Sequence, residues 1–452
     1  MERKELRAAA SLATVFSVRM LGLFMIYPVF ATFAQQLKGA TTSKIGLALG
    51  IYGLSQGLLQ IPFGLLSDRV GRKVMIVIGL VIFGLGSAVA ARSSSIDGVI
   101  LGRALQGAGA VGSVILALVA DLTAEESRTK AMALVGMTIG ASFLVAIVTG
   151  PVVGASIGVG GIFWLMAALA LVGIMITAFL VPSPPPPRAH RETLAVPALI
   201  GSTLRNPELL RLDFGIFALH AMLTASFLVL PEMLHETLKV SSRDQWLIYL
   251  PILTLSVAIM VPAIILAERY RRMKSVFIGA IAALAVSQIA LAAAGEEIYA
   301  LLAALVVFFA GFNIMEASLP SLVTKTAPSG STGTATGIYS SSQFLGIFAG
   351  GIMGGWLYQT AGATGVFSFG GLLALVWLLV AATMRPPRYL TTRLVRVGHS
   401  AALDSEQVAA RLRAVPGVAE VIVVAEEGLA YLKVDSKLFD RSKAARAIIE
   451  AI

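Results

Sequence analysis

The chain is a series of long apolar runs separated by short polar or charged segments. A run of about 20 apolar residues has the length of an α-helix that crosses a bilayer core. Reading the runs against turn residues and charges predicts twelve membrane-spanning helices in two sets of six. They are expected at residues 10–34, 43–66, 74–92, 96–121, 128–152 and 159–182, and then at 209–234, 243–267, 274–294, 297–322, 332–357 and 363–384. The pattern therefore predicts an all-α polytopic membrane protein.

A polar stretch with four consecutive prolines, Pro184 to Pro187, separates the two sets. Because consecutive prolines cannot continue a helix, this stretch is expected to be an extended connector. The pattern of apolar and polar positions thus sets the predicted domain limits. These are an N-terminal six-helix half at 1–182, a cytoplasmic connector at 183–208, a C-terminal six-helix half at 209–384, a linker at 385–391 and a tail domain at 392–452.

Composition supports a membrane protein and excludes several function classes. Hydrophobic residues make up 57% of the chain and charged residues 13%, against roughly 25% charged in an average soluble chain. With no cysteine, disulfides, thiolate metal sites and cysteine nucleophiles are excluded. The four histidines are scattered, and no nucleophile–base pair is evident. We therefore expect no metal site, no cofactor and no enzyme activity.

The distribution of charge predicts the topology. Lysine and arginine concentrate at the N-terminus and in the loops on its side of the membrane. The opposite loops carry only five of them: Lys38, Lys44, Arg92, Lys239 and Arg243. Under the positive-inside rule both termini lie in the cytoplasm. Since most of the net charge of +10 belongs to this membrane portion, we expect a lipid bilayer and no nucleic acid as the partner.

An internal repeat supports the division into halves. A shift of 200 residues places Pro62 on Pro262, Asp68 on Glu268 and Arg72 on Arg272. Many transporters consist of two such repeats, with the substrate site between them near the middle of the bilayer.

The loop from Gly64 to Lys73 reads Gly-Leu-Leu-Ser-Asp-Arg-Val-Gly-Arg-Lys. Gly71 permits a tight reversal between two helices, and Asp68, Arg69 and Arg72 place opposite charges at a helix end. This loop resembles the loop between helices 2 and 3 of the major facilitator superfamily. The resemblance implies that Asp68 and Arg72 act as a conformational latch with Asp121, and that this latch breaks as the cytoplasmic side opens.

Two further motifs resemble those of the same superfamily. In Leu101–Ala110, Arg103 lies within a membrane helix, where an unpartnered arginine costs roughly 2.5–3.5 kcal/mol. It should therefore face the protein interior, although an arginine near a helix end can also reach the interface. The resemblance gives Arg103 an electrostatic role in proton coupling. Gly150, Pro151 and Gly154 resemble the antiporter motif, but its last glycine is replaced by Ala155, and the same residues also serve helix packing.

The predicted tenth membrane helix carries the main candidate for proton or substrate binding. Glu316 is a carboxylate deep in an apolar span, with Asn313 one turn away on the same face. An apolar environment favours the neutral form of a carboxyl group, so Glu316 is suited to take and release a proton. Arg19 is a candidate ion partner for a carboxylate, and His220 titrates near neutral pH. The alternatives are a structural glutamate and a histidine that serves only packing.

After residue 391 the sequence alternates as a small α+β domain. Strands are expected at 392–397, 420–425 and 429–434, and helices at 403–414 and 438–451, which is a ferredoxin-like order with a possible missing last strand. A missing strand would expose a sheet edge that can pair with a second copy of the domain. The tail, the run from Phe312 to Lys325 and the run from Gly333 to Gly346 resemble the YajR-type branch of the superfamily.

This resemblance implies a proton-driven transporter of the inner membrane. The leading hypothesis is a proton-coupled antiporter that exports small amphiphilic compounds by alternating access. The alternatives are a uniporter or symporter of a small polar metabolite, and a membrane-embedded sensor with the tail domain as its output.

Overall fold

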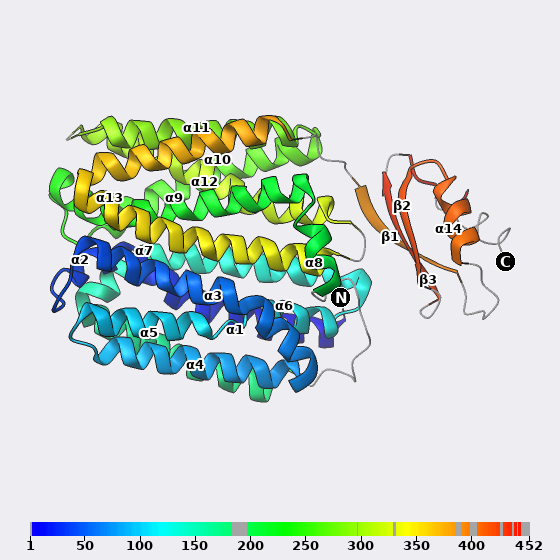
Figure 1. Ribbon diagram of the computed structural model, residues 1–452, viewed down its shortest axis with the longest axis horizontal. Helices are drawn as coiled ribbons and strands as arrows, with labels where there is room; N and C mark the ends of the chain where they lie inside the picture. Colours follow the sequence, from blue (N-terminus) through cyan, green and yellow to red (C-terminus); the bar gives the residue numbers. More distant parts are fainter. Residues whose placement is uncertain are drawn as a thin grey trace.

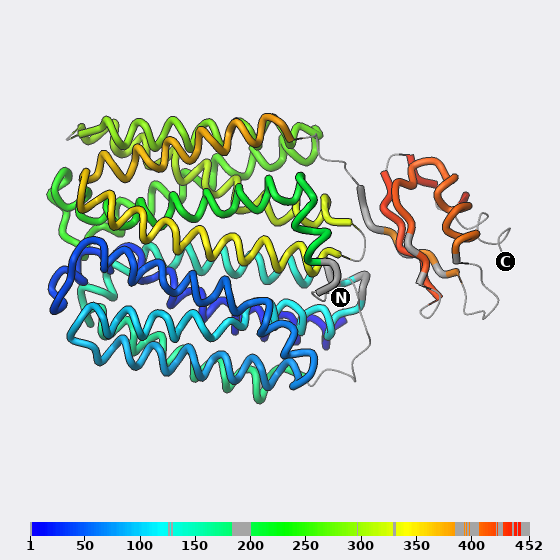
Figure 2. Tube along the Cα trace, viewed as in Figure 1, coloured from blue at the N-terminus to red at the C-terminus, as the bar shows by residue number. Residues whose placement is uncertain are grey.

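The computed structural model describes residues 2–182, 197–295, 297–328, 331–384, 390–397, 405–424, 428–435, 438–440 and 442–443. Its long helices lie side by side along one direction and form a bundle, with a small sheet domain beyond one end (Figure 1). The start of α1 and the small domain lie toward the same end, which we call the terminal end; the opposite end is the far end (Figure 2).

The bundle consists of an N-terminal set and a C-terminal set of helices. The N-terminal set contains α1 (Arg3–Met25), α2 (Tyr27–Ala34), α3 (Thr42–Val70), α4 (Arg72–Arg92), α5 (Ile96–Ala108), α6 (Gly112–Asp121), α7 (Glu125–Met175) and the π-helix η1 (Ile176–Leu180). The C-terminal set contains α9 (Pro207–Leu238), α10 (Trp246–Arg269), α11 (Met273–Ala293), α12 (Ile298–Thr326) and α13 (Thr332–Ala382). A short helix, α8 (Pro197–Thr203), precedes the second set.

Ten helical stretches in the described part of the chain are long and apolar enough to cross a membrane. Two of them, α7 and α13, have 51 residues each, about 77 Å if straight, more than twice the thickness of a bilayer core. Each contains one glycine with a non-helical backbone, Gly158 (φ 69°, ψ 173°) and Gly362 (φ 64°, ψ −161°). For α13 the chain visibly turns back at the far end (Figure 1). Each reversal divides its element into two passes, so the prediction of twelve spans is confirmed.

Two of the predicted spans are not continuous helices. The first breaks at Ile26, just before Pro28, and the fourth breaks between Ala108 and Gly112. Proline lacks the backbone N–H that would continue the helical ladder, and the small residues around Gly109 allow the chain to leave helical geometry. In the predicted connector, the four prolines lie outside the described residues, but α8 shows that its last part is helical and not extended.

The two sets approach each other most closely at the far end. Along the α3–α13 contact, a Cβ atom added to Gly46 would lie 2.2 Å from the Gly351 carbonyl oxygen. Toward the terminal end, a Cβ atom at Gly57 would lie 3.1 Å from the Ser341 carbonyl oxygen, and one at Gly337 would lie 3.9 Å from Ile61. These helices therefore touch backbone to backbone at the far end and diverge toward the terminal end.

The small domain is a three-stranded antiparallel sheet with one helix on it. Its elements are β1 (Leu390–Arg396), α14 (Ser405–Arg413), β2 (Val418–Val424) and β3 (Leu429–Asp435), and the strand order is β1-β3-β2. A separate apolar core joins α14, through Val408 and Leu412, to Leu432 and Val434 of β3. The predicted α+β order is confirmed through the third strand. Of the second predicted helix, 438–451, residues 441 and 444–451 lie outside the described residues.

Candidate functional site

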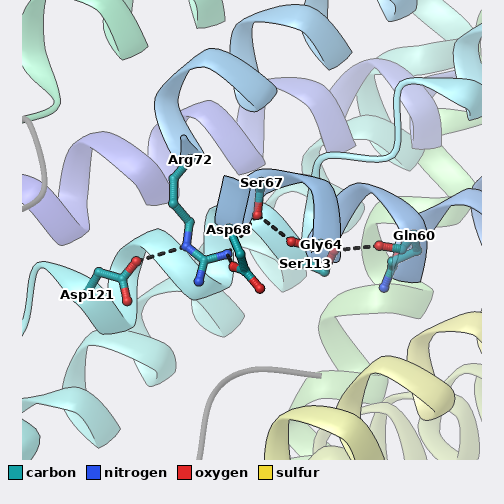
Figure 3. Close-up of polar contacts among 7 residues, drawn as sticks. All are labelled: Gln60, Gly64, Ser67, Asp68, Arg72, Ser113 and Asp121. Carbon is teal, nitrogen blue, oxygen red and sulfur yellow. Dashed lines mark hydrogen bonds and ion pairs between the residues drawn. The ribbon is translucent and has the colours of Figure 1, made fainter. Parts of the chain in front are cut away.

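The loop between α3 and α4 forms a network of charges at the terminal end (Figure 3). The Arg72 guanidinium lies 2.7 Å from an Asp68 carboxylate oxygen and 2.9 Å from Asp121 Oδ2. It also donates a hydrogen bond of 2.7 Å to Ser67 Oγ. Because Asp121 ends α6, one arginine joins the ends of three helices of the N-terminal set. Arg69 is exposed and takes no part in these contacts.

Gly71 provides the turn that brings this arginine into position. Its φ of 105° lies in a region that residues other than glycine rarely adopt. The turn starts α4 at Arg72 directly after α3 ends, so the Arg72 side chain points back at the end of α3. Lys73 donates a hydrogen bond of 2.8 Å to the Val181 carbonyl after η1, which anchors the same corner to the last pass of the set.

A second group of polar residues lies midway along α9, α12 and α13. His220 Nδ1 lies 3.3 Å from the Ile216 carbonyl oxygen, and His220 Nε2 lies 2.8 Å from Gln343 Nε2. Since a carbonyl can only accept, Nδ1 carries the hydrogen, and Nε2 then accepts from the Gln343 amide. This assigns the neutral tautomer to His220.

Glu316 faces this histidine without a hydrogen bond to it. Its Oε2 lies 3.8 Å from His220 Nε2 and is buried without a hydrogen-bond partner. The side chain of Glu316 as a whole is 36% exposed, against 3% for His220. Solvent is therefore excluded from the carboxyl group only on the side that faces His220. One turn away, Asn313 Nδ2 donates a hydrogen bond of 2.8 Å to Ser256 Oγ of α10. The structure thus brings Glu316, Asn313 and His220 to the same depth of the C-terminal set.

The two predicted interior arginines lie in the N-terminal set, away from this group. Arg19 Nη2 donates to Tyr52 Oη at 2.7 Å, to Gln56 Oε1 at 2.6 Å and to the Gly109 carbonyl at 3.3 Å. The break between α5 and α6 leaves that carbonyl free of the helical ladder. Arg19 Nε and Nη1 are buried and have no hydrogen-bond partner. Within the described part of the chain, Arg19 contacts only neutral groups, and the expected carboxylate partner is not among them.

Arg103 is 1% exposed, and each of its three guanidinium nitrogens donates a hydrogen bond to a neutral group. It donates to the Ala48 carbonyl at 3.2 Å, to the Leu49 carbonyl at 3.4 Å and to Gln106 Oε1 at 3.0 Å. Its guanidinium also lies 4.9 Å from the centre of the Tyr52 ring, a cation–π distance. Arg103 therefore faces the protein interior, as the cost of an arginine in a bilayer requires.

Aromatic rings join the two sets beside the Glu316 group. Phe143 of α7 stacks on Phe312 of α12 with ring centres 5.7 Å apart and also meets Phe24 of α1 edge-on at 5.1 Å. Tyr27 of α2 meets Phe227 of α9 at 5.5 Å. Phe312 lies one turn from Glu316 in the direction of the far end. We call these five rings the aromatic layer; they separate Glu316 from the far end along this contact.

Hydrogen bonds join the two sets within the aromatic layer and beyond it. Tyr27 Oη lies 3.3 Å from Thr224 Oγ1, Gln35 donates to Glu232 at 3.3 Å, and Ser43 Oγ donates to Gln359 at 2.7 Å. The last two pairs lie at the far end of the bundle. Together with the close α3–α13 contact, they close the far end in this conformation.

The glycine-proline motif of α7 packs against the break in the first span. A Cβ atom at Gly150 would lie 2.7 Å from the Met25 carbonyl oxygen, and one at Gly154 would lie 3.0 Å from Val29. Pro151 lies inside the same helix. The motif therefore provides a smooth surface on which the α1–α2 junction lies.

Comparison with known proteins agrees with this geometry. The model of the Major Facilitator Superfamily matches residues 12–351 and 212–419. The chain belongs to the major facilitator superfamily. The model of the YajR YAM domain matches residues 399–449, within the predicted tail domain.

The chain is also similar to individual proteins of the superfamily. The chain is 44% identical over 447 residues to the inner membrane transport protein YajR of Escherichia coli strain K12, covering 99% of this chain and 98% of that relative. It is 29% identical over 165 residues to a class B tetracycline resistance protein of Escherichia coli, covering 35% of this chain and 40% of that relative. Membership of the superfamily and the likeness to YajR make this chain a multi-pass transporter of the inner membrane.

Solved structures of the superfamily show the same fold. A bacterial homologue of the human lysosomal transporter Spinster, in an inward-facing and occupied conformation, matches with a TM-score of 0.64 at 13% identity. The match covers 84% of this chain and 96% of that chain. At this identity the likeness concerns the fold alone.

Several residues of the site had no signal in the sequence. Gln343 and the rings of the aromatic layer other than Phe312 come from helices that are distant in sequence, so only packing brings them to Glu316. Tyr52, which lies between Arg19 and Arg103, looked like any aromatic residue of an apolar helix. Asp213 is a buried carboxylate in α9, 7% exposed, and a search for charges within apolar spans would have found it.

Proposed function

We propose that this transporter is a proton-coupled antiporter that exports small amphiphilic compounds by alternating access. The observation that carries the proposal is the position of Glu316. It is a carboxyl group at mid-depth with one oxygen buried beside His220, on the terminal side of the aromatic layer. A carboxyl group in that position exchanges protons with the terminal side while the far end is closed.

Glu316 and His220 form the proton site in this proposal. Asn313 fixes the spacing between α12 and α10 through its hydrogen bond to Ser256. Arg103 and Arg19 act at longer range. Their two guanidinium groups, which have neutral partners, give the N-terminal set a positive interior that shapes the electrostatics of proton coupling in this proposal. The terminal end faces the cytoplasm, in keeping with the positive-inside rule.

Alternating access requires the bundle to close at one end and then at the other. In the conformation described, the far end is closed by the aromatic layer, by the Ser43–Gln359 pair and by the α3–α13 contact. Opening to the other side requires these contacts to separate and the terminal ends of the sets to meet. Asp68, Gly71, Arg72 and Asp121, with Arg69 beside them, make their contacts within the N-terminal set while the terminal end is the more open one. In this proposal they therefore hold the ends of α3, α4 and α6 together during the movement and do not break when that end opens. Gly150, Pro151 and Gly154 give α1 and α2 a surface on which to shift.

The domain limits in this proposal are those expected from the sequence, with 1–182 and 209–384 as the moving halves and 392–452 as a cytoplasmic domain. The substrate is a small molecule exchanged for protons. The likeness of part of the chain to a tetracycline resistance protein supports an amphiphilic substrate and export.

One observation favours a second candidate, symport of a small polar metabolite. Arg19, Arg103, Gln56, Gln60 and Gln106 form a buried polar group in the N-terminal set, where an antiporter of apolar compounds needs none. The two functions differ in the direction of coupling. An antiporter accumulates substrate on the side from which protons flow, whereas a symporter accumulates it on the side to which they flow.

A flux screen in proteoliposomes tests the proposal. Fluorescent lipophilic cations and a panel of small polar metabolites would be measured with and without a pH gradient. Glu316→Gln is expected to abolish gradient-driven flux and to retain exchange of substrate in the absence of a gradient. Glu297→Gln makes the same chemical change at an exposed position at the start of α12 and should behave as wild type. Gradient-driven flux that survives in Glu316→Gln would refute the proposal.

A further inference from the structure

The two faces of the sheet in the small domain make different contacts. On β3, Ala430, Leu432 and Val434 belong to the apolar core under α14. Side chains alternate along a strand, so Tyr431, Lys433 and Asp435 lie on the opposite face. That face is turned toward the terminal end of the bundle, and α14 lies on the side away from it (Figure 1).

Two polar contacts hold this face on the C-terminal set. Lys433 Nζ donates a hydrogen bond to the carbonyl oxygen of Ala327, at the end of α12. The carboxyl end of a helix carries partial negative charge, which suits a lysine. Arg271 Nη2, in the corner between α10 and α11, lies 3.1 Å from Asp435 Oδ1. Lys433 and Tyr431 are each 7% exposed, so solvent is largely excluded from this face.

The backbone of the α10–α11 corner is strained at the residue that makes the ion pair. Arg271 has a φ of 54°, in the left-handed region, which is unfavourable for a residue with a side chain. The repeat of 200 residues places Arg271 on Gly71, whose φ is 105°. The N-terminal corner thus has a glycine where the turn demands one, and the C-terminal corner tolerates an arginine. Backbone strain of this kind points to a function for the side chain.

We propose that the α10–α11 corner and the end of α12 form a docking site for the small domain, and that the docked domain clamps α10 to α12. These two helices carry Ser256 and Asn313, whose hydrogen bond lies beside Glu316. The clamp therefore acts on the spacing of the helices that hold the mid-depth group. The proposal concerns the domain and does not depend on which compound is carried.

The docking is releasable. The side chains of Arg271 and Asp435 are 36% and 29% exposed, and ion pairs of this exposure contribute little to stability. Their attraction also weakens as salt screens it. A ligand or partner that binds the Tyr431 face therefore competes with the bundle for the domain and loosens the clamp.

Cross-linking in the full chain tests the docking site, because the chain contains no cysteine. Cysteines would replace Arg271 and Asp435 and be joined by a bifunctional thiol reagent with a short spacer, since an ion pair of these side chains exceeds the reach of a disulfide. The matched control is the pair Arg69→Cys with Asp435→Cys, which uses the equivalent corner of the N-terminal set. At least fivefold more cross-linking of the Arg271 pair is expected, because the contact between Lys433 and Ala327 remains in this variant. Equal yields from the two corners would overturn the docking site.

Hydrogen exchange in the full chain tests the clamp. Lys433→Met keeps the length of the side chain and removes the bond to Ala327. Faster backbone exchange is expected at 269–273 and at 322–327, with no change in the equivalent corner at 69–73. If Lys433→Met leaves exchange at both C-terminal segments as in wild type, the clamp is refuted. Gln407→Ala, on the exposed side of α14, serves as the control for damage to the domain itself.

Discussion

Arg72 Nε lies 2.9 Å from Asp121 Oδ2 while another nitrogen of the same guanidinium lies 2.7 Å from Asp68. Both carboxylates therefore depend on a single cation, whose side chain is 10% exposed. All three residues belong to the N-terminal set. In the conformation described, with the far end closed, the contact fastens the ends of α3, α4 and α6 to one another.

Asp121→Asn is expected to destabilise the protein, because it removes one of two charges that Arg72 holds in a largely buried position. Loss of one partner from such a network costs about 1–3 kcal/mol. Thermal unfolding of the purified protein would measure it. Asp97→Asn breaks the exposed pair with Lys44 and should cost less than about 0.5 kcal/mol. Equal losses in the two variants would show that the Arg72 network contributes no more than a surface pair.

Gly71→Ala should destabilise the corner for reasons of backbone conformation alone. No atom lies within 4 Å of a Cβ at this position, so the cost of about 1–3 kcal/mol comes from the φ of 105°. Gly136→Ala is the matched change, because Gly136 lies inside α7 and also has open space around it. Alanine is favoured in a helix by about 0.5–1 kcal/mol, so thermal unfolding should shift in opposite directions. A stabilised Gly71→Ala variant would contradict the account of this turn.

Gly46→Ala is expected to hold the far end open. The added methyl group would lie 2.2 Å from the Gly351 carbonyl oxygen, a distance that requires α3 and α13 to separate. Cross-linking of cysteines placed at Ser43 and Gln359, whose side chains are hydrogen-bonded, would report the closure. Its yield should fall at least fivefold in Gly46→Ala and stay unchanged in Gly279→Ala, where nothing lies within 4 Å. An unchanged yield in Gly46→Ala would mean that the contact does not control closure.

Phe143→Ala should let reagents pass from the far side to the depth of Glu316. The Phe143–Phe312 stack is worth about 0.5–1.5 kcal/mol beyond its buried area, so its loss shifts opening of the layer by up to about tenfold. A single cysteine at Asn313 would be labelled with a membrane-impermeant maleimide added from the far side. Phe277→Ala removes a ring of the same size that packs on Trp377 inside the C-terminal set. If both variants are labelled at the same rate, the aromatic layer is not the barrier.

The sequence predicted the membrane passes well, because each pass needs a continuous apolar run and leaves a signal that does not depend on its neighbours. It also marked Arg72 and Asp121, since charges at helix ends stand out in such a chain. The breaks at Ile26 and near Gly109 were missed, because apolar runs continue through both of them. Gln343 as the donor to His220, and Tyr52 as the partner of Arg19, depend on how α13, α9, α3 and α1 pack, which no single run encodes.

The contact between Arg271 and Asp435 gives the small domain a fixed place on one moving half. If the C-terminal helices rock against the N-terminal helices, the small domain moves with them as a rigid extension beyond the bundle. Its distance from the corner at Arg69 then changes in each transport cycle. A fluorescent pair at these two places would report the state of the transporter from outside the membrane.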